Sequence, residues 1–108
     1  IFGPLLPIIV YDELETAVRE IKAREKPLAC YVFTRDKRKA EALISRLSFG
    51  SGCVNDVLLQ IGNHRLPFGG VGNSGMGAYH GRYGFETFSH KKAVVKNTGF
   101  SVSLRAFW

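Results

Sequence analysis

The chain has 108 residues, of which 45% are hydrophobic and 22% are charged. These fractions exclude an intrinsically disordered protein, and the length suits one domain or a part of a larger one. The net charge of +6 could suggest a nucleic-acid partner, but Lys and Arg are spread along the chain. The densest basic run, residues 35–39, includes an acid and begins an expected helix, so we expect no nucleic-acid partner.

The two cysteines, Cys30 and Cys53, do not form a Cys-x-x-Cys pair, and Cys30 lies in an apolar run typical of a buried, reduced thiol. No segment resembles a signal peptide, and no apolar run approaches the ~20 residues that span a bilayer. We therefore expect a cytoplasmic protein with no membrane anchor in this chain.

The first expected elements are a strand and a helix. A short apolar, β-branched run predicts a buried strand over residues 5–11. Asp12 is expected to cap a helix, with Glu15 completing a capping box and Pro27 ending the helix. The apolar stripe of this helix consists of Leu14, Ala17, Val18 and Ile21.

A second strand and helix follow. Residues 28–34 predict a second buried strand, and Thr34 or Asp36 can cap the helix after it. Gly50 and Gly52 are expected to end that helix. Its apolar stripe consists of Ala40, Leu43, Ile44 and Leu47.

A third, shorter extended segment is expected over residues 53–54 and 57–61. The order strand, helix, strand, helix, strand at this spacing indicates an α/β fold. Such a βαβαβ pattern favours a parallel sheet with right-handed crossovers.

Glycine dominates the next stretch, with eight of the 23 residues from 62 to 84. A glycine-rich loop of this length in a compact protein is usually functional or disordered. Several apolar anchors argue against disorder: Phe68, Met76, Tyr79, Tyr83 and Phe85. Residues 87–96 predict a strand, and the tail, residues 97–108, is too apolar to stay free in solvent.

The segment Gly70-Val71-Gly72-Asn73-Ser74-Gly75 matches the G-x-G-x-x-G dinucleotide fingerprint. That fingerprint follows a strand and opens a helix, whereas Pro67-Phe68 precede this one and no apolar helical stripe follows it. We interpret it as a glycine-rich turn system. An unrelated nucleotide-binding domain that uses this segment is an alternative.

The three histidines, His64, His80 and His90, lack metal-ligand spacing, so no metal site is expected. His80 lies inside the glycine-rich loop, where its simplest role is a hydrogen bond that fixes the loop. A Cys–His dyad with His80 is conceivable, but nothing in the sequence lowers the pKa of either thiol, and both cysteines are interpreted as structural.

Six blocks of sequence, read in order, resemble the carboxy-terminal part of an aldehyde dehydrogenase. They are Ile1-Phe2-Gly3-Pro4, Lys26-Pro27-Leu28-Ala29 with Tyr31-Val32-Phe33, Val54-Asn55-Asp56-Val57, the run from Leu66 to Gly77, Tyr79-His80-Gly81, and Phe85-Glu86-Thr87-Phe88-Ser89-His90. The last two blocks resemble the class three branch, which includes the fatty-aldehyde enzymes. The resemblance covers nearly the whole chain and weakens only after Lys96.

The resemblance implies an NAD- or NADP-dependent oxidation of aldehydes to carboxylates through a cysteine thioester. In this family the nucleophile, the glutamate base, the oxyanion-binding asparagine and the dinucleotide-binding domain all precede the matched segment, so no catalytic residue is expected in this chain. The resemblance also implies a division of the chain. Residues 1–86 would complete the catalytic domain, 87–96 would form an oligomerisation strand, and 97–108 would be a tail.

The resemblance assigns roles to single residues as well. Phe2 matches an aromatic residue beside the nicotinamide ribose, and Asn55 falls in a segment that supports the catalytic loop. Leu58 and Leu59 match a loop at the mouth of the aldehyde tunnel.

Phe68 matches an aromatic near the reacting carbon, and His80 matches a histidine at the substrate end. The strand over Phe88–Val95 implies a homodimer. A non-catalytic truncated paralogue that pairs with larger subunits through this strand is the main alternative function.

Overall fold

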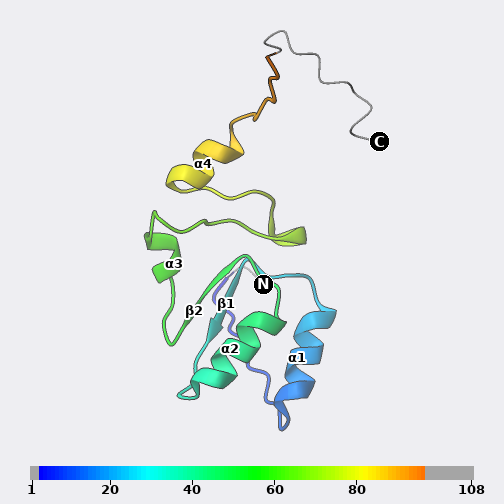
Figure 1. The fold of residues 1–108 in the computed structure, drawn as a ribbon. Helices are drawn as coiled ribbons and strands as arrows, with labels where there is room; N and C mark the ends of the chain where they lie inside the picture. Colours follow the sequence, from blue (N-terminus) through cyan, green and yellow to red (C-terminus); the bar gives the residue numbers. More distant parts are fainter. Residues whose placement is uncertain (1–2, 97–108) are drawn as a thin grey trace, which may run out of the picture.

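The computed structural model describes residues 3–96 and contains a small parallel sheet flanked by helices (Figure 1). The strands β1 (Ala29–Val32) and β2 (Ser51–Val54) pair in parallel, with Ala29 opposite Ser51 and Val32 opposite Val54. Helix α2 (Lys37–Arg46) connects the two strands, and α1 (Leu14–Ala23) precedes β1. The expected α/β class is confirmed, with a parallel pair at its centre.

Helix α1 buries part of the stripe that the sequence predicts, since Val18 is only 2% exposed whereas Ile21 is 45% exposed. The predicted cap at Asp12 is wrong. Glu13 is the N-cap residue and makes no side-chain capping bond. The Glu15 carboxylate accepts two hydrogen bonds from the Arg46 guanidinium of α2, at 2.7 and 2.5 Å, and so ties the two helices together.

Helix α2 begins as predicted at Asp36, whose carboxylate accepts from the backbone N–H groups of Arg38 and Lys39 at 2.9 and 3.2 Å. The prediction that glycines end this helix is wrong, because Leu47 is its C-cap residue, in an extended conformation. Gly50 immediately precedes β2 and Gly52 lies within it, where β2 pairs with β1. A side chain at Gly52 would collide with the Cys30 carbonyl oxygen, so the glycine permits close strand pairing.

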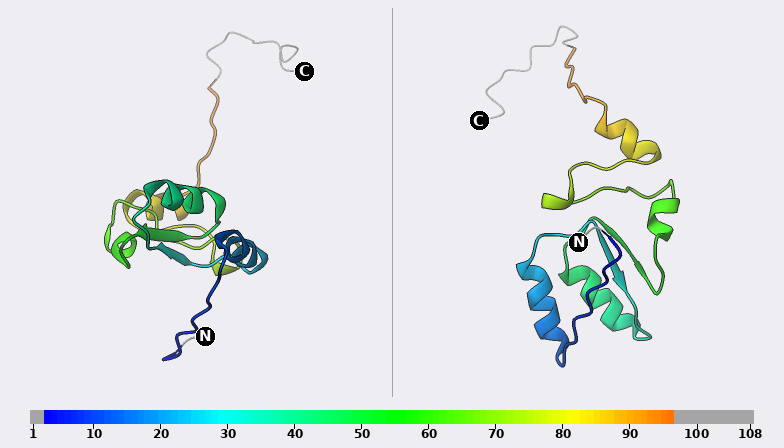
Figure 2. Two further views of the ribbon diagram at one scale, coloured as in Figure 1. Left: turned by 90° about the horizontal axis from the view of Figure 1, so that it is seen from below. Right: turned by 180° about the vertical axis from the view of Figure 1, so that it is seen from behind.

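The first strand of the expected βαβαβ unit is absent from the described part of the chain, and the third is present only as β2, which covers residues 53–54 of the expected segment. Residues 5–11 form no strand, and Leu6 and Val10 are 84% and 87% exposed. Figure 2 shows this segment leading away from the sheet, on the side opposite to α2. An apolar strand forms only where a neighbouring strand can accept its backbone hydrogen bonds, and residues 3–96 offer none here.

Residues 57–61 also differ from the prediction of an extended segment. The chain turns at Leu58, whose φ is +64°, and enters the short helix α3 (Leu59–Gly62) beside β2. The positive φ reverses the chain direction, so the apolar run cannot continue as a strand.

The glycine-rich stretch contains the 3₁₀ helix η1 (Gly72–Ser74), and helix α4 (Gly81–Thr87) follows. Helix α4 was not predicted from the sequence. Residues 88–96 form no sheet within the described chain and lead away from α4 (Figure 1), with Phe88 and Val95 90% and 94% exposed. No helix among residues 3–96 is both long and apolar enough to cross a bilayer.

Candidate functional site

The aromatic residues of the glycine-rich stretch gather around an antiparallel bridge between Phe68 and Tyr79. The Phe68 N–H donates to the Tyr79 carbonyl at 3.1 Å, and the Tyr79 N–H donates back at 2.9 Å. This bridge places the Phe68 ring 6.0 Å from that of His80, nearly parallel at 24°, while the Tyr79 ring lies 4.4 Å from His80, edge to face. Two residues predicted from the sequence, Phe68 and His80, therefore lie together.

His80 is buried, with 8% of its surface exposed, and its Nδ1 lies 3.2 Å from the Leu66 carbonyl oxygen. Because a carbonyl oxygen only accepts, this contact requires the proton on Nδ1. His64 approaches the same ring at 5.0 Å. The loop-fixing hydrogen bond expected of His80 is present, and it closes the loop between Leu66 and α4.

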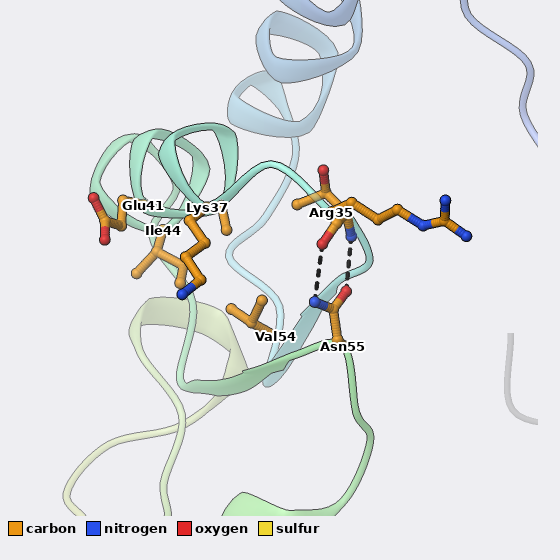
Figure 3. Close-up of a pocket in the computed structure, with 8 residues that line it drawn as sticks. Arg35, Lys37, Glu41, Ile44, Val54 and Asn55 are labelled. Carbon is orange, nitrogen blue, oxygen red and sulfur yellow. Dashed lines mark hydrogen bonds between the residues drawn. The ribbon is translucent and has the colours of Figure 1, made fainter.

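Asn55 lies where β2 ends and joins the two strand ends (Figure 3). Its side-chain oxygen accepts from the Thr34 N–H at 2.8 Å, and its side-chain amide donates to the Thr34 carbonyl at 2.9 Å. Its own N–H donates to the Val32 carbonyl at 2.8 Å. The side chain thus extends the parallel ladder beyond the last backbone pair, a role consistent with supporting a neighbouring loop.

A cleft of about 460 Å³ opens beside Asn55, between α2 and the carboxyl ends of the strands. Its lining residues are Thr34, Arg35, Lys37, Ala40, Glu41, Ile44, Val54 and Asn55. A second cleft of about 550 Å³ lies between residues 9–13 and α1. None of the other predicted site residues that the structure describes, Leu58, Leu59, Phe68 and His80, lines either cleft, so Asn55 shares no pocket with them.

Leu58 and Leu59 lie at the start of α3 and are 60% and 63% exposed. They present apolar surface to solvent. Phe2, the predicted cofactor-side residue, lies outside the described residues.

A third group of side chains was missed by the sequence analysis. Gln60 in α3 is only 5% exposed, and its oxygen accepts from the Cys53 thiol at 2.8 Å. Its amide donates to the Tyr31 hydroxyl of β1 at 3.0 Å. The sequence signal that could have revealed this group is Gln60 itself, the single amide inside the apolar run from Val57 to Ile61. A buried amide side chain needs hydrogen-bond partners, so its place in that run indicates a hydrogen-bonded site.

Both cysteines are free. Burial raises the pKa of the Cys30 thiol, which disfavours the thiolate that a nucleophile needs. The Cys53 thiol donates a hydrogen bond to the side-chain oxygen of Gln60. These contacts favour the structural interpretation of both residues.

The segment Gly70–Gly75 folds back on itself. The Ser74 hydroxyl donates to the Val71 carbonyl at 3.0 Å and accepts from the Val71 N–H at 2.9 Å. A side chain at Gly70 would collide with the Ser74 backbone, so this glycine permits close backbone packing. The geometry favours a turn system over a phosphate cradle. Among residues 3–96, no group of three or more His, Cys, Asp or Glu side chains could hold a metal ion.

The model of the aldehyde dehydrogenase family matches residues 1–94. This chain belongs to the aldehyde dehydrogenase family. It is 50% identical over 95 residues to the 4,4'-diaponeurosporen-aldehyde dehydrogenase of Staphylococcus aureus, covering 88% of this chain and 21% of that protein. It is 52% identical over 95 residues to the rat "Aldehyde dehydrogenase, dimeric NADP-preferring", again covering 88% of this chain and 21% of the relative.

The Arabidopsis thaliana aldehyde dehydrogenase family 3 member H1 is 50% identical over 103 residues, which cover 95% of this chain and 21% of that aldehyde dehydrogenase. A solved structure described as the substrate-bound state of Staphylococcus aureus AldH superposes with a TM-score of 0.84 at 47% identity, covering 96% of this chain and 23% of that one. The resemblance to the class three branch is therefore confirmed. The chain spans about a fifth of the length of these aldehyde dehydrogenases.

Proposed function

We propose that this chain completes the catalytic domain of an aldehyde dehydrogenase that oxidises aldehydes to carboxylates with NAD or NADP as hydride acceptor. The observation that supports this most strongly is the family match over residues 1–94. Relatives that are about half identical are all named as aldehyde dehydrogenases.

The proposed chemistry divides between two parts of the polypeptide. A cysteine thiolate attacks the aldehyde carbon, hydride leaves to the nicotinamide, and water hydrolyses the thioester with help from a glutamate. Those groups belong to sequence that precedes the matched segment in the family. The cofactor-side residue of this chain, Phe2, lies outside the described residues, so we assign no step of hydride transfer to residues 3–96.

The proposed contribution of this chain is the wall of the aldehyde pocket. The thiohemiacetal that thiolate attack forms needs an apolar enclosure that limits access of water until hydride has left and the thioester has formed. The paired backbone of Phe68 and Tyr79, with the buried His80 against both rings, provides a rigid aromatic surface for that purpose. Leu58 and Leu59 are assigned to the mouth of the tunnel, and Asn55 to support of the strand ends.

We also propose that residues 88–95 add to a sheet of a second subunit in a homodimer. The segment is exposed at both ends, at Phe88 and Val95, and carries Lys91 and Lys92 between them. Lysines on an edge strand discourage indiscriminate pairing while allowing one specific partner. The rat relative is itself named as dimeric. A cytoplasmic location is part of the same proposal.

A chimera tests the function. In the Staphylococcus aureus relative, the carboxy-terminal segment that matches this chain is replaced by this full 108-residue chain. We expect aldehyde-dependent reduction of NAD or NADP at a rate within about tenfold of the parent enzyme. A chimera that folds and assembles like the parent but does not oxidise aldehydes would contradict the proposal.

The exposed segment over Phe88–Val95 also favours a second candidate, a non-catalytic module that pairs with larger subunits. Co-expression of the tagged chain with the full-length relative separates the two functions. Stable co-purification with no effect of Phe68→Ala on the activity of the chimera would favour the module.

A further inference from the structure

Helix α3 cannot be stable by itself. It has four residues, whereas isolated helices shorter than ~12–15 residues are marginal in water. Its N-cap residue is Leu58, whose positive φ is unfavourable for a branched side chain. Contacts with the rest of the fold must therefore hold this turn in place.

Gln60 supplies those contacts. It is the buried residue of α3, at 5% exposure, and both ends of its amide are satisfied. The oxygen accepts the Cys53 thiol of β2, and the nitrogen donates to the Tyr31 hydroxyl of β1. One side chain thus fastens α3 to both strands of the sheet.

Gln60, which anchors α3 to the sheet, and the exposed Leu58 and Leu59 lie in one short turn. Gln60 points into the protein, while Leu58 and Leu59, two positions and one position earlier, are 60% and 63% exposed. Because a single turn moves as a unit, the orientation of the leucines follows from how tightly Gln60 is held.

We infer that Gln60 is a positioning residue that fixes Leu58 and Leu59 and thereby sets the affinity for the apolar chain of the aldehyde. This inference rests on the proposed function. Residues at a tunnel mouth contact the distant part of the substrate, which binds equally in the ground state and the transition state. Such contacts change KM and leave kcat nearly constant.

The test uses the chimera with two substitutions that share the loss of one hydrogen bond: Tyr31→Phe removes the bond between Tyr31 and Gln60, and Gln60→Met removes that bond together with the one from Cys53. Methionine keeps the length of glutamine without its polar groups. We expect KM for decanal to rise about threefold to tenfold in Tyr31→Phe, the equivalent of one ordinary hydrogen bond, and at least as much in Gln60→Met, with kcat changed less than about twofold in both. KM for propanal, which is too short to reach the mouth, should change less.

Two further measurements make the result specific. The double variant should raise KM less than the product of the single effects, because both substitutions remove one shared bond. Tyr83→Phe, which removes the hydroxyl of a tyrosine in α4 outside this network, is the matched control and should leave KM for decanal unchanged.

An unchanged KM for decanal, or a fall in kcat with KM constant, would overturn the inference. Hydrogen exchange separates this failure from failure of the proposed function. If the unsubstituted chimera folds but is inactive, the proposed function fails. Exchange of residues 57–62 then still reports on the anchor, and equal protection with and without Gln60→Met would refute it.

Discussion

Three residues other than glycine have a positive φ among residues 3–96, namely Asn55, Leu58 and His80. All three are site residues that the family resemblance assigns. Backbone conformations of this kind cost free energy and persist where surrounding contacts enforce them, which is common at functional sites. In this chain, hydrogen bonds stabilise each of these conformations. The Asn55 side-chain amide bonds the Thr34 backbone, and the His80 ring bonds the Leu66 carbonyl. The hydrogen bond from Gln60 to Tyr31 fixes the turn that follows Leu58.

Asn55→Ala should destabilise the protein by about 1–2 kcal/mol. The substitution removes two hydrogen bonds to the Thr34 backbone and places alanine at a φ of +56°, which asparagine tolerates better. Urea unfolding of the chimera measures the change. Asn55→Gly is the control, because it loses the same bonds without backbone strain and should be less destabilising than alanine.

Phe68→Ala should lower kcat/KM for aldehydes by about tenfold or more, while the urea midpoint changes little. The Phe68 ring belongs to the aromatic surface beside His80, whereas the Phe68–Tyr79 bridge is made by the backbone and survives the substitution. Phe85→Ala, at an aromatic residue of α4 that is 74% exposed, is the matched control. Equal kinetics for Phe68→Ala and the parent would remove Phe68 from the site.

At the scale of elements, the two helices are joined by a charged pair at their surface. The hydrogen bond from Arg46 lowers the pKa of the Glu15 carboxyl. A group with a lowered pKa stabilises the folded state above its ordinary pKa and loses that contribution as the pH falls through the lowered value. The pair is exposed to solvent, so its effect on stability is expected to be small.

Glu15→Gln should therefore be slightly less stable than the parent at pH 7 and equal to it at an acidic pH below the lowered pKa of Glu15. Urea unfolding at the two pH values, at low salt, measures the difference. Glu20→Gln removes the same charge from the same helix without the contact to Arg46 and controls for net charge. A gap between parent and Glu15→Gln that grows on acidification would contradict this assignment.

At the scale of the whole molecule, apolar surface is abundant and the core is small. Among the described residues the buried apolar side chains are Val18, Val32 and Ala40. Exposed apolar side chains extend from Leu5 through Val10 at one end to Phe88 and Val95 at the other. Surface of this kind marks contacts with other polypeptide, which agrees with a chain that spans about a fifth of its relatives.

The isolated 108-residue chain is expected to show no aldehyde oxidation, because burial raises the pKa of the Cys30 thiol, the Cys53 thiol donates to Gln60, and the proposed nucleophile lies elsewhere in the family. A spectrophotometric assay of NAD and NADP reduction with several aldehydes checks this. Turnover by the purified chain above that of a Cys30→Ser, Cys53→Ser double variant would refute it.

The sequence alone determined the family, Asp36 as one of two candidate caps, the burial of Val18 in α1 and a strand over 28–34 that the structure shortens to Ala29–Val32. These features depend on residues close together in the chain or on motifs whose order identifies them. It also indicated that Phe68 and His80 belong to one site.

Tertiary structure decided the rest, because the deciding partner in each case lies far along the chain. Residues 5–11 have the composition of a strand but no strand beside them, so periodicity alone predicted the wrong element. Glu15 matches a capping box, yet its carboxylate binds the Arg46 guanidinium, 31 positions away in the sequence. A charged guanidinium is a stronger hydrogen-bond partner for a carboxylate than a local backbone N–H. Gln60 looks like one polar residue in an apolar run, and only the packing of α3 on β1 and β2 gives it Tyr31 and Cys53 as partners.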